Sequence, residues 1–265
     1  MTAPGRALEH MRAVAPLVQN ITNYVAMNPM ANILLAAGAS PAMVHAREEA
    51  AEFAAIADAL TINIGTLSAA WLESMVEAAA AANAAAKPWV LDPVAVGATA
   101  FRRSAGERLL ALGPTLIRGN ASEIIALAHR VDSGKGVDSA DAVSAAESAA
   151  TELARATGAV VAVTGPVDFV TDGTRAARIA NGDALMPRVT ALGCALTGVA
   201  GAFLGAGCER FDGTVAALAY YGLAGEIAAA GAAGPGSFAV RFLDALAGIG
   251  PDELDAGARI ERLAG

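Results

Sequence analysis

The sequence predicts one α/β domain whose mostly parallel sheet is covered by helices on both faces. The chain has 265 residues, a usual length for a single α/β unit, so we expect residues 1–265 to form one domain. Hydrophobic residues make up 55% of the chain and charged residues 17%, which allows a large buried core. Short, nearly continuous apolar runs alternate with longer helical segments. That alternation is typical of parallel strands that are buried on both faces.

Six short apolar runs are the predicted strands, and the longer segments between them favour helices. The strands are expected at residues 59–63, 89–91, 115–117, 159–163, 168–171 and 175–179. The helices are expected at residues 24–37, 48–57, 69–86, 104–112, 122–128, 139–156, 194–205, 214–230 and 237–246. Asp172 and Gly173 separate the last two strands, and an Asp-Gly pair between strands is a strong hairpin signal. We therefore expect the sheet to be mixed at one edge.

The charge of the chain limits its partners. The net charge is −8 and no cluster of Lys and Arg occurs, which argues against nucleic acid as a partner. An anionic ligand such as ATP would have to be held locally, by helix N-termini, a few basic groups and a divalent cation. Two cysteines outside any CxxC pair fit a reducing cytoplasm, and Glu9 and His10 interrupt the apolar core that a signal peptide would need.

One long apolar stretch and two missing motifs narrow the class further. Residues 189–208 carry no charge, but they contain five glycines and no flanking aromatic belt. All-round apolar helices occur both in membranes and in the cores of other proteins. Because of the glycines and the missing aromatic belt, we interpret this stretch as a buried helix and not as a membrane span.

The sequence lacks two nucleotide-binding motifs: it has no GxxxxGKS/T loop, and no GxGxxG follows a predicted strand. A P-loop kinase and a Rossmann dehydrogenase are therefore disfavoured.

Polar residues stand directly after several predicted strands. In parallel α/β sheets, ligands bind beyond the carboxyl ends of the strands, so these residues should converge on one rim. The residues concerned are Asn63 and Gly65, Asp92, Arg118 with Gly119 and Asn120, and Thr164 with Gly165.

The turn at Gly193-Cys194 opens the uncharged helix and is the strongest candidate for an anion site. Small residues let backbone N–H groups approach a ligand, and a helix N-terminus carries about half a positive charge. The candidate donors are the backbone groups of residues 191–194, that is Ala191, Leu192, Gly193 and Cys194. A thiol in the first helical turn is expected to have a lowered pKa and could accept the proton of an alcohol. The competing interpretation is that the glycine permits tight packing and that Cys194 is a small buried hydrophobe.

Other candidates also have two readings. Asp92 could hold Mg²⁺ through water or could form a turn before Pro93. Glu123 could organise a cation, but with Asn120 it also matches a capping box. Arg118 at a strand end could pair with a phosphate or could be an ordinary surface arginine, and its place on the expected rim favours the phosphate. Met43 could line a small-molecule pocket or fill the core.

A set of short strings, in order along nearly the whole chain, resembles the hydroxyethylthiazole kinase family of the ribokinase-like fold. Each string is weak alone, whereas the set in this order and spacing is specific. The strings are QNITN at 19–23, GASPAM at 38–43, NIGTL at 63–67, LDPV at 91–94, IRGNASE at 117–123, KGVD at 135–138, VTG at 163–165, GCALT at 193–197 and GPGSF at 234–238.

The resemblance implies a fold, a reaction and a set of site residues. It implies a ribokinase-like three-layer sandwich that uses ATP and Mg²⁺ to phosphorylate the hydroxyl of 4-methyl-5-(2-hydroxyethyl)thiazole, in thiamine biosynthesis or salvage. It also implies a homotrimer with substrate sites shared between subunits. The implied roles are substrate contact for Met43, Ala191, Asn23 and Gly65, ATP contact for Arg118 and Thr164, Mg²⁺ organisation for Asp92 and Glu123, and catalysis for Cys194.

One position departs from the family pattern, and two other functions stay open. The family usually reads Thr-Gly-x-Gly-Cys, and here Ala191 replaces the first glycine. If that position requires a positive φ, the alanine carries a strain of about 1–2 kcal/mol. If the position only requires a small residue, the extra methyl group narrows the pocket slightly. The alternatives are a ribokinase-like kinase for another small alcohol and a non-catalytic small-molecule binder.

Overall fold

A nine-stranded sheet forms the middle layer of the molecule. The computed structural model describes residues 3–131 and 142–263, and the strand order is β2-β1-β3-β4-β5-β6-β7-β8-β9. Neighbouring strands from β2 to β6 are parallel, and those from β6 to β9 are antiparallel. The strands are β1 (Leu17–Ile21), β2 (Ser40–Ala42), β3 (Ala59–Asn63), β4 (Trp89–Asp92), β5 (Leu116–Asn120), β6 (Val160–Thr164), β7 (Asp168–Thr171), β8 (Ala176–Ile179) and β9 (Ile260–Leu263).

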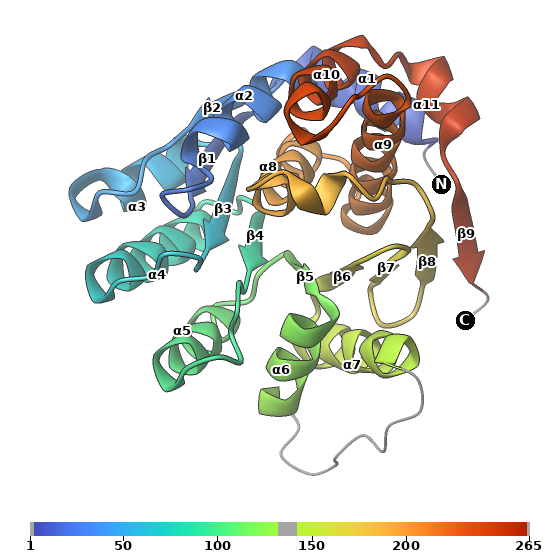
Figure 1. Ribbon diagram of the computed structural model, residues 1–265. Helices are drawn as coiled ribbons and strands as arrows, with labels where there is room; N and C mark the ends of the chain where they lie inside the picture. Colours follow the sequence, from blue (N-terminus) through green and yellow to red (C-terminus); the bar gives the residue numbers. More distant parts are fainter. Residues whose placement is uncertain (1–2, 132–141, 264–265) are drawn as a thin grey trace.

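Helices cover both faces of this sheet, as Figure 1 shows. Those on one face are α1 (Pro4–Val14), α2 (Met27–Ala37), α8 (Leu192–Gly205), α9 (Arg210–Ala230), α10 (Pro235–Gly248) and α11 (Pro251–Gly257). Those on the other are α3 (Arg47–Ile56), α4 (Ala69–Ala84), α5 (Ala100–Leu110), α6 (Ala121–Val131) and α7 (Ala142–Thr157). A short 3₁₀ turn, η1 (Met186–Arg188), precedes α8. The predicted three-layer arrangement with a mostly parallel sheet is confirmed.

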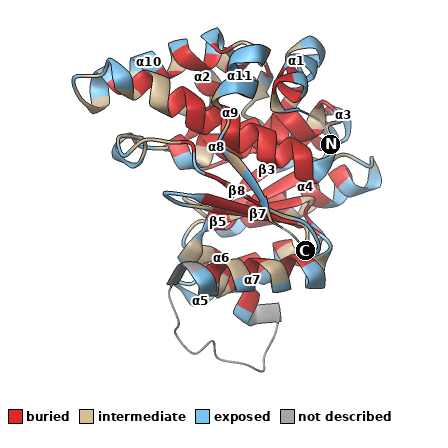
Figure 2. Ribbon diagram, turned by 90° about the vertical axis from the view of Figure 1, so that its right-hand side faces the viewer, coloured by how far each residue is buried: buried red, intermediate tan, exposed pale blue. Residues whose placement is uncertain are grey.

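The helix α8 lies against the middle of the sheet, and Figure 2 shows α8 and α9 as largely buried. Its glycines explain the close approach. A Cβ on Gly201 would lie 2.8 Å from the side chain of Thr61, and a Cβ on Gly205 would lie 3.1 Å from Ala59. These two glycines therefore serve packing, as the packing interpretation of the uncharged stretch requires. Within the described parts of the chain, none of the helices has the length and apolar character that a membrane crossing requires.

The predicted elements agree with the structure, although some boundaries differ and several strands and helices were not predicted. The hairpin at Asp172-Gly173 is present, with Gly173 at φ 90° and the Asp172 carboxylate accepting from two backbone N–H groups. The helix expected from residue 24 begins at Met27, because the side chain of Asn23 accepts from the Ala26 N–H and forms a turn there. The strands β1, β2 and β9 and the helices α1 and α11 were not expected. Residues 139–141 of one predicted helix and the KGVD string at 135–138 lie outside the described residues.

Candidate active site at the carboxyl ends of the parallel strands

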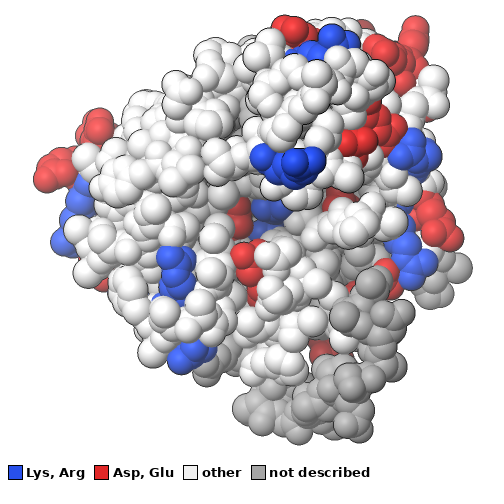
Figure 3. All heavy atoms as spheres, in the orientation of Figure 1, with Lys and Arg blue, Asp and Glu red and all other residues white. Residues whose placement is uncertain are grey.

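The expected rim exists at the carboxyl ends of the parallel strands. Asn63 at the end of β3 and Asp92 at the end of β4 are register partners. Asn120 at the end of β5 and Thr164 at the end of β6 are also register partners. In Figure 3, acidic and basic side chains lie together near the middle of a mostly uncharged face, over the region that Figure 1 assigns to β4 and β5.

Asp92 is the buried centre of this rim, with only 1% of its surface exposed. Its Oδ2 accepts hydrogen bonds from Asn63 Nδ2 at 2.7 Å and from Thr197 Oγ1 at 2.9 Å, and Arg118 Nη1 lies 3.6 Å away. Burial raises the pKa of Asp92 to about 6, with the nearby Arg118 charge acting in the opposite direction. Its Oδ1 is buried and has no hydrogen-bond partner among the described residues. That oxygen is therefore available to a cation or to a ligand.

Arg118 connects the carboxylate to the other side of the rim. Its Nη2 donates to Thr164 Oγ1 at 2.6 Å, and its side chain is 11% exposed. A Cβ on Gly193 would lie 3.5 Å from the same Nη2, so the guanidinium stands beside the turn at the start of α8. Beyond Thr164, the buried Asp168 accepts from the Gly165 N–H at 2.9 Å and shapes the loop between β6 and β7. A guanidinium between a carboxylate and an open helix start is placed to contact a bound phosphate.

Glu123 forms the capping box that its spacing with Asn120 predicts. Asn120 Oδ1 accepts from the Glu123 N–H at 3.0 Å, and Glu123 Oε2 accepts from the Asn120 N–H at 2.8 Å. Glu123 Oε1 also accepts from the Ala95 N–H at 2.9 Å, so this carboxylate ties the loop after β4 to the start of α6. Its charge raises the pKa of Asp92, although less than burial does. The capping role is therefore observed, and a role in cation binding remains a prediction.

The two carboxylates fit a hard divalent cation in their chemistry. No group of three or more His, Cys, Asp or Glu side chains within residues 3–131 and 142–263 is arranged to hold a metal directly. The unpartnered Oδ1 of Asp92 is nevertheless the type of oxygen that Mg²⁺ prefers, and Mg²⁺ usually keeps several of its waters. Asp92 and Glu123 thus fit a cation that is held by one or two carboxylates and completed by water and substrate phosphates.

The turn before α8 has the backbone that an anion site needs. Ala191 is the N-cap at φ 67° and ψ −3°, in the left-handed region, so the condition for strain at this position is met. The first N–H groups of a helix have no partner within the helix. Gly193 is exposed and Leu192 is buried, which leaves the Gly193 backbone open on the rim side.

Cys194 lies in the first turn of α8, and its thiol is in contact with the ends of β1 and β3. Asn23 Nδ2 donates to Cys194 Sγ at 3.3 Å and to Asn63 Oδ1 at 2.9 Å. The expected lowering of the thiol pKa is wrong. Burial, followed by the negative charge of Asp92, raises the pKa of Cys194, and the hydrogen bond from Asn23 opposes this. A helix N-terminus favours the thiolate, but here desolvation next to a carboxylate outweighs it.

The remaining predicted substrate residues stand at the same end of the sheet. Gly65 donates its N–H to Asn63 Oδ1 at 2.9 Å, and a Cβ there would lie 2.8 Å from the Asn23 side chain. Glycine is thus required for the close approach of Asn23. Met43 directly follows β2, the strand beside β1, and is half-buried against the core. Asn23, Gly65 and Cys194 are brought together by these contacts, with Met43 farther along the edge.

Three residues of this network were not assigned a role from the sequence. Asn63 links Asn23, Gly65 and Asp92 through its amide. Thr197 donates to Asp92 and lies three residues after Cys194, a spacing that places two helical side chains on one face. That spacing was the available signal for Thr197. Arg102 was also missed; its guanidinium donates to carbonyl groups of the loops after β3 and β4.

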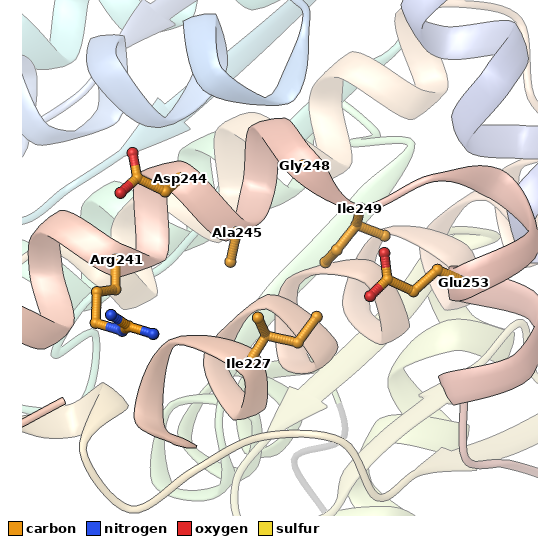
Figure 4. Close-up of a pocket in the computed structure, with 7 residues that line it drawn as sticks. All are labelled: Ile227, Arg241, Asp244, Ala245, Gly248, Ile249 and Glu253. Atoms are coloured by element: carbon orange, nitrogen blue, oxygen red, sulfur yellow. The ribbon is translucent and has the colours of Figure 1, made fainter. Parts of the chain in front are cut away.

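A separate hollow lies on the outer helices. Its volume is about 380 Å³, and Figure 4 shows Arg241 and Glu253 at opposite sides of it, with Ile227 and Ala245 between them. The lining residues come from α9, α10 and α11 with the connection between the last two, and include none of the rim residues above. The conjunction of a buried carboxylate, a guanidinium and an open helix start therefore identifies the rim as the candidate active site.

The chain is similar to known proteins over nearly its whole length. The family model described as "Hydroxyethylthiazole kinase family" matches residues 8–252. A protein from Cereibacter sphaeroides named hydroxyethylthiazole kinase is 68% identical over 257 residues, which cover 97% of this chain and 98% of that protein. A solved hydroxyethylthiazole kinase protein from Pyrococcus horikoshii OT3 has a TM-score of 0.92 at 41% identity and covers 99% of this chain and 100% of its own.

A more distant structure shares the fold alone. The pyridoxal kinase from Staphylococcus aureus, solved in complex with AMP-PCP, has a TM-score of 0.58 at 16% identity and covers 77% of this chain and 86% of its own. The nearly full-length match to the family model and the high identity to a member of that family lead to one conclusion. The chain belongs to the hydroxyethylthiazole kinase family.

Proposed function

We propose that this protein transfers the γ-phosphoryl group of ATP to the hydroxyl of 4-methyl-5-(2-hydroxyethyl)thiazole, as a step of thiamine biosynthesis or salvage. The observation that carries the proposal is the position of the Arg118 guanidinium, between buried Asp92 on one side and the Gly193 turn on the other. Membership of the family supplies the substrate.

The arrangement suits a reaction in which negative charge develops on a transferring group. Phosphoryl transfer needs little covalent chemistry from the protein and depends on positioning and electrostatic stabilisation. The open N–H groups at the start of α8 and the Arg118 guanidinium would face that charge together. Arg118 and Thr164, already joined by a hydrogen bond, are the proposed ATP contacts.

Mg²⁺ is the proposed cation, and Asp92 and Glu123 would hold it. The unpartnered Oδ1 of Asp92 supports this, together with the hydrogen bonds that fix the Glu123 side chain at the start of α6. When bound, the cation would neutralise charge on the phosphates. In this site Arg118 would keep Asp92 ionised near neutral pH, since its positive charge opposes the effect of burial on the carboxyl pKa.

Cys194 is the proposed proton acceptor for the alcohol. Its thiol has a raised pKa, so it is mainly protonated at pH 7 and is a weak ground-state base. Asn23 holds the sulfur in place and would favour the thiolate by donating to it. The thiazole alcohol would lie between Met43, Ala191, Asn23 and Gly65, with its hydroxyl toward Cys194.

An assay of ADP release tests the activity directly. The purified protein is incubated with ATP, Mg²⁺ and the thiazole alcohol, and ADP is measured against a control without alcohol. Release that depends on the alcohol is the expected result. Equal release in both samples would overturn the proposal. A panel of other small alcohols distinguishes a kinase of different specificity, and a nucleotide-dependent thermal shift without turnover would identify a non-catalytic binder.

We also propose a homotrimer with substrate sites at its subunit interfaces, in a reducing cytoplasm. Three exposed apolar side chains, Tyr24, Val25 and Leu35, follow Asn23 on the chain and support a covered surface beside the site. Both cysteines, Cys194 and Cys208, are free thiols, which supports the proposed reducing compartment. Light scattering after gel filtration should give about 79 kDa, because three chains of 26.3 kDa assemble. A mass of one chain would contradict the trimer.

A further inference from the structure

Two adjacent, fully buried tyrosines on α9 bind carbonyl groups in different parts of the molecule. The Tyr221 hydroxyl donates to the Leu192 carbonyl at 2.8 Å, at the first residue of α8. The neighbouring Tyr220 hydroxyl donates to the Leu246 carbonyl in α10 and accepts from Arg12 in α1. One tyrosine therefore contacts the candidate anion site, and the other joins the outer helices.

The Leu192 carbonyl belongs to the same peptide unit as the Gly193 N–H. A trans peptide is planar, and its C=O and N–H point in opposite directions. In a helix the carbonyls point toward the C-terminus, so the Gly193 N–H points out of the N-terminal end of α8. A hydroxyl that holds the carbonyl consequently sets the direction of the N–H on the other side of the peptide.

We propose that the Tyr221 hydroxyl is a positioning group for phosphoryl transfer, which aims the Gly193 N–H at the transferring group by holding the Leu192 carbonyl. This inference rests on the proposed kinase function. Tyr221 does not touch substrate in this scheme, because its hydroxyl is buried beneath the turn. It acts through the Leu192–Gly193 peptide.

The backbone conformation before this peptide explains why the hydrogen bond from Tyr221 is needed. Ala191 is held at φ 67°, a conformation that an L residue leaves readily when nothing maintains it. Without the Tyr221 hydroxyl, the Leu192 carbonyl would be held only by the hydrogen bonding of the helix itself, and the direction of the Gly193 N–H would be less firmly fixed. A donor contributes fully to transition-state stabilisation only while it is already oriented.

The anchor itself is rigid, because α9 is fixed on two sides. The Tyr221 ring packs edge-on against Phe242 of α10, with ring centroids 4.8 Å apart. Farther along α9, a Cβ on Gly222 would lie 2.7 Å from the Asn181 backbone, and a Cβ on Gly225 would lie 2.5 Å from the Met186 sulfur. These contacts hold α9 against the segment that leads through η1 to Ala191. The tyrosine is thus a stable reference for the turn.

Tyr220 provides a matched control. Both residues lie on α9, both rings are buried, and each substitution by Phe removes one hydroxyl without leaving a large cavity. Tyr220→Phe breaks contacts to Leu246 and Arg12, whereas Tyr221→Phe breaks the contact to Leu192 alone. Any effect of general loosening should therefore be at least as large in Tyr220→Phe.

The test compares wild type, Tyr221→Phe and Tyr220→Phe by steady-state kinetics with ATP and the thiazole alcohol. Loss of a whole transition-state donor costs about 10²–10³ in kcat, so a donor that is present but poorly oriented should cost about 5- to 50-fold. We expect that loss in Tyr221→Phe, with both KM values within about twofold of wild type, as for an interaction made only in the transition state. Tyr220→Phe should keep kcat within about twofold.

A binding measurement supplies a readout that does not depend on turnover. ADP with aluminium fluoride imitates the transferring group, and transition-state mimics depend on the same donors. Tyr221→Phe should weaken binding of ADP–aluminium fluoride and leave binding of ADP unchanged. A kcat of Tyr221→Phe close to wild type, or an equal loss in both variants, would overturn the inference. If wild type itself releases no alcohol-dependent ADP, the proposed function fails instead.

Discussion

Ala191 offers a direct test of how the anion turn is built. Alanine in the left-handed region costs about 1–2 kcal/mol, and Ala191→Gly would remove that cost. Glycine loses more conformational freedom on folding, which costs about 0.5–1 kcal/mol. The difference predicts that Ala191→Gly stabilises the folded state by about 0.5–1 kcal/mol. For a domain of this size, that raises the melting temperature by about 1–3 °C.

The matched control is Ala111→Gly. Ala111 is exposed and has φ −63°, a conformation that alanine adopts freely, so only the entropic cost of glycine applies. This variant should melt about 1–3 °C below wild type. Thermal unfolding of the three proteins, at equal concentration and without ligand, gives the comparison. If Ala191→Gly lowers the melting temperature as much as Ala111→Gly does, strain at φ 67° is not the reason that the family usually carries glycine there.

Three further predictions concern the titratable groups of the site and its neighbouring hairpin. Cys194→Ala should lower kcat by about 10²-fold, which is the lower end for loss of a general base, because the raised thiol pKa leaves little thiolate. Cys194→Asp should retain activity, and a loss under about threefold in the alanine variant would exclude a role as base. Asp92→Asn should lower kcat by about 10²-fold at saturating Mg²⁺ while the melting temperature is kept, and an unchanged kcat would remove Asp92 from the machinery. The third prediction compares Asp168→Asn with Asp172→Asn by urea unfolding between pH 4 and pH 7.5. Burial raises the pKa of Asp168 to about 6 from its usual 3.8, so the folded state binds the proton more tightly, and stability is lost as the pH rises through 6. Asp168→Asn should therefore gain about 2–3 kcal/mol relative to wild type over this range. Asp172 is partly buried, but hydrogen bonds from the Arg175 backbone and side chain hold the pKa of Asp172 below its usual 3.8. The stability that this carboxylate contributes is therefore already present above pH 4, and Asp172→Asn should be less stable than wild type by a nearly constant amount from pH 4 to pH 7.5. If both variants were more stable than wild type near pH 7, or both less stable, this account would be contradicted.

The central strands were predictable because burial on both faces leaves a local pattern. The strands β3 to β8 read as apolar runs, and the Asp-Gly pair between β7 and β8 marked the antiparallel edge. The strand β1 is equally buried but contains Gln19 and Asn20. Gln19 Nε2 donates to the carbonyls of Val44 and Ala50, and Asn20 Oδ1 accepts from Thr61. Those partners are distant in sequence, so the two polar residues hid a strand whose Gln19 amide N–H groups and Asn20 carbonyl oxygen find their partners only in the fold.

The two edge strands could not be predicted from the sequence for a related reason. The strand β2 has three residues and contains Pro41, which is tolerated at a sheet edge. The strand β9 carries exposed Glu261 and Arg262 and gains its place only by pairing with β8. Neither pattern indicates a strand without the neighbour that it pairs with.

The sequence by itself determined which residues could form the site. Position after a buried strand singled out Asp92, Arg118 and Thr164, and the small residues before an apolar helix singled out Gly193 and Cys194. These inferences hold because the ends of parallel strands meet at one edge. The spacing of Asn120 and Glu123 also determined the capping box, since both of its hydrogen bonds are local.

Only the tertiary structure decided how these residues behave. The direction of the Cys194 pKa shift depends on burial and on the charge of Asp92, which comes from a strand about a hundred residues earlier in the chain. The hydrogen bonds of Asn63 to Asn23 and Asp92, and that of Tyr221 to Leu192, likewise join distant segments. Desolvation and long-range hydrogen bonds are properties of the packed molecule. For this reason the turn at Gly193-Cys194 could be located from sequence, whereas its protonation and its support could not.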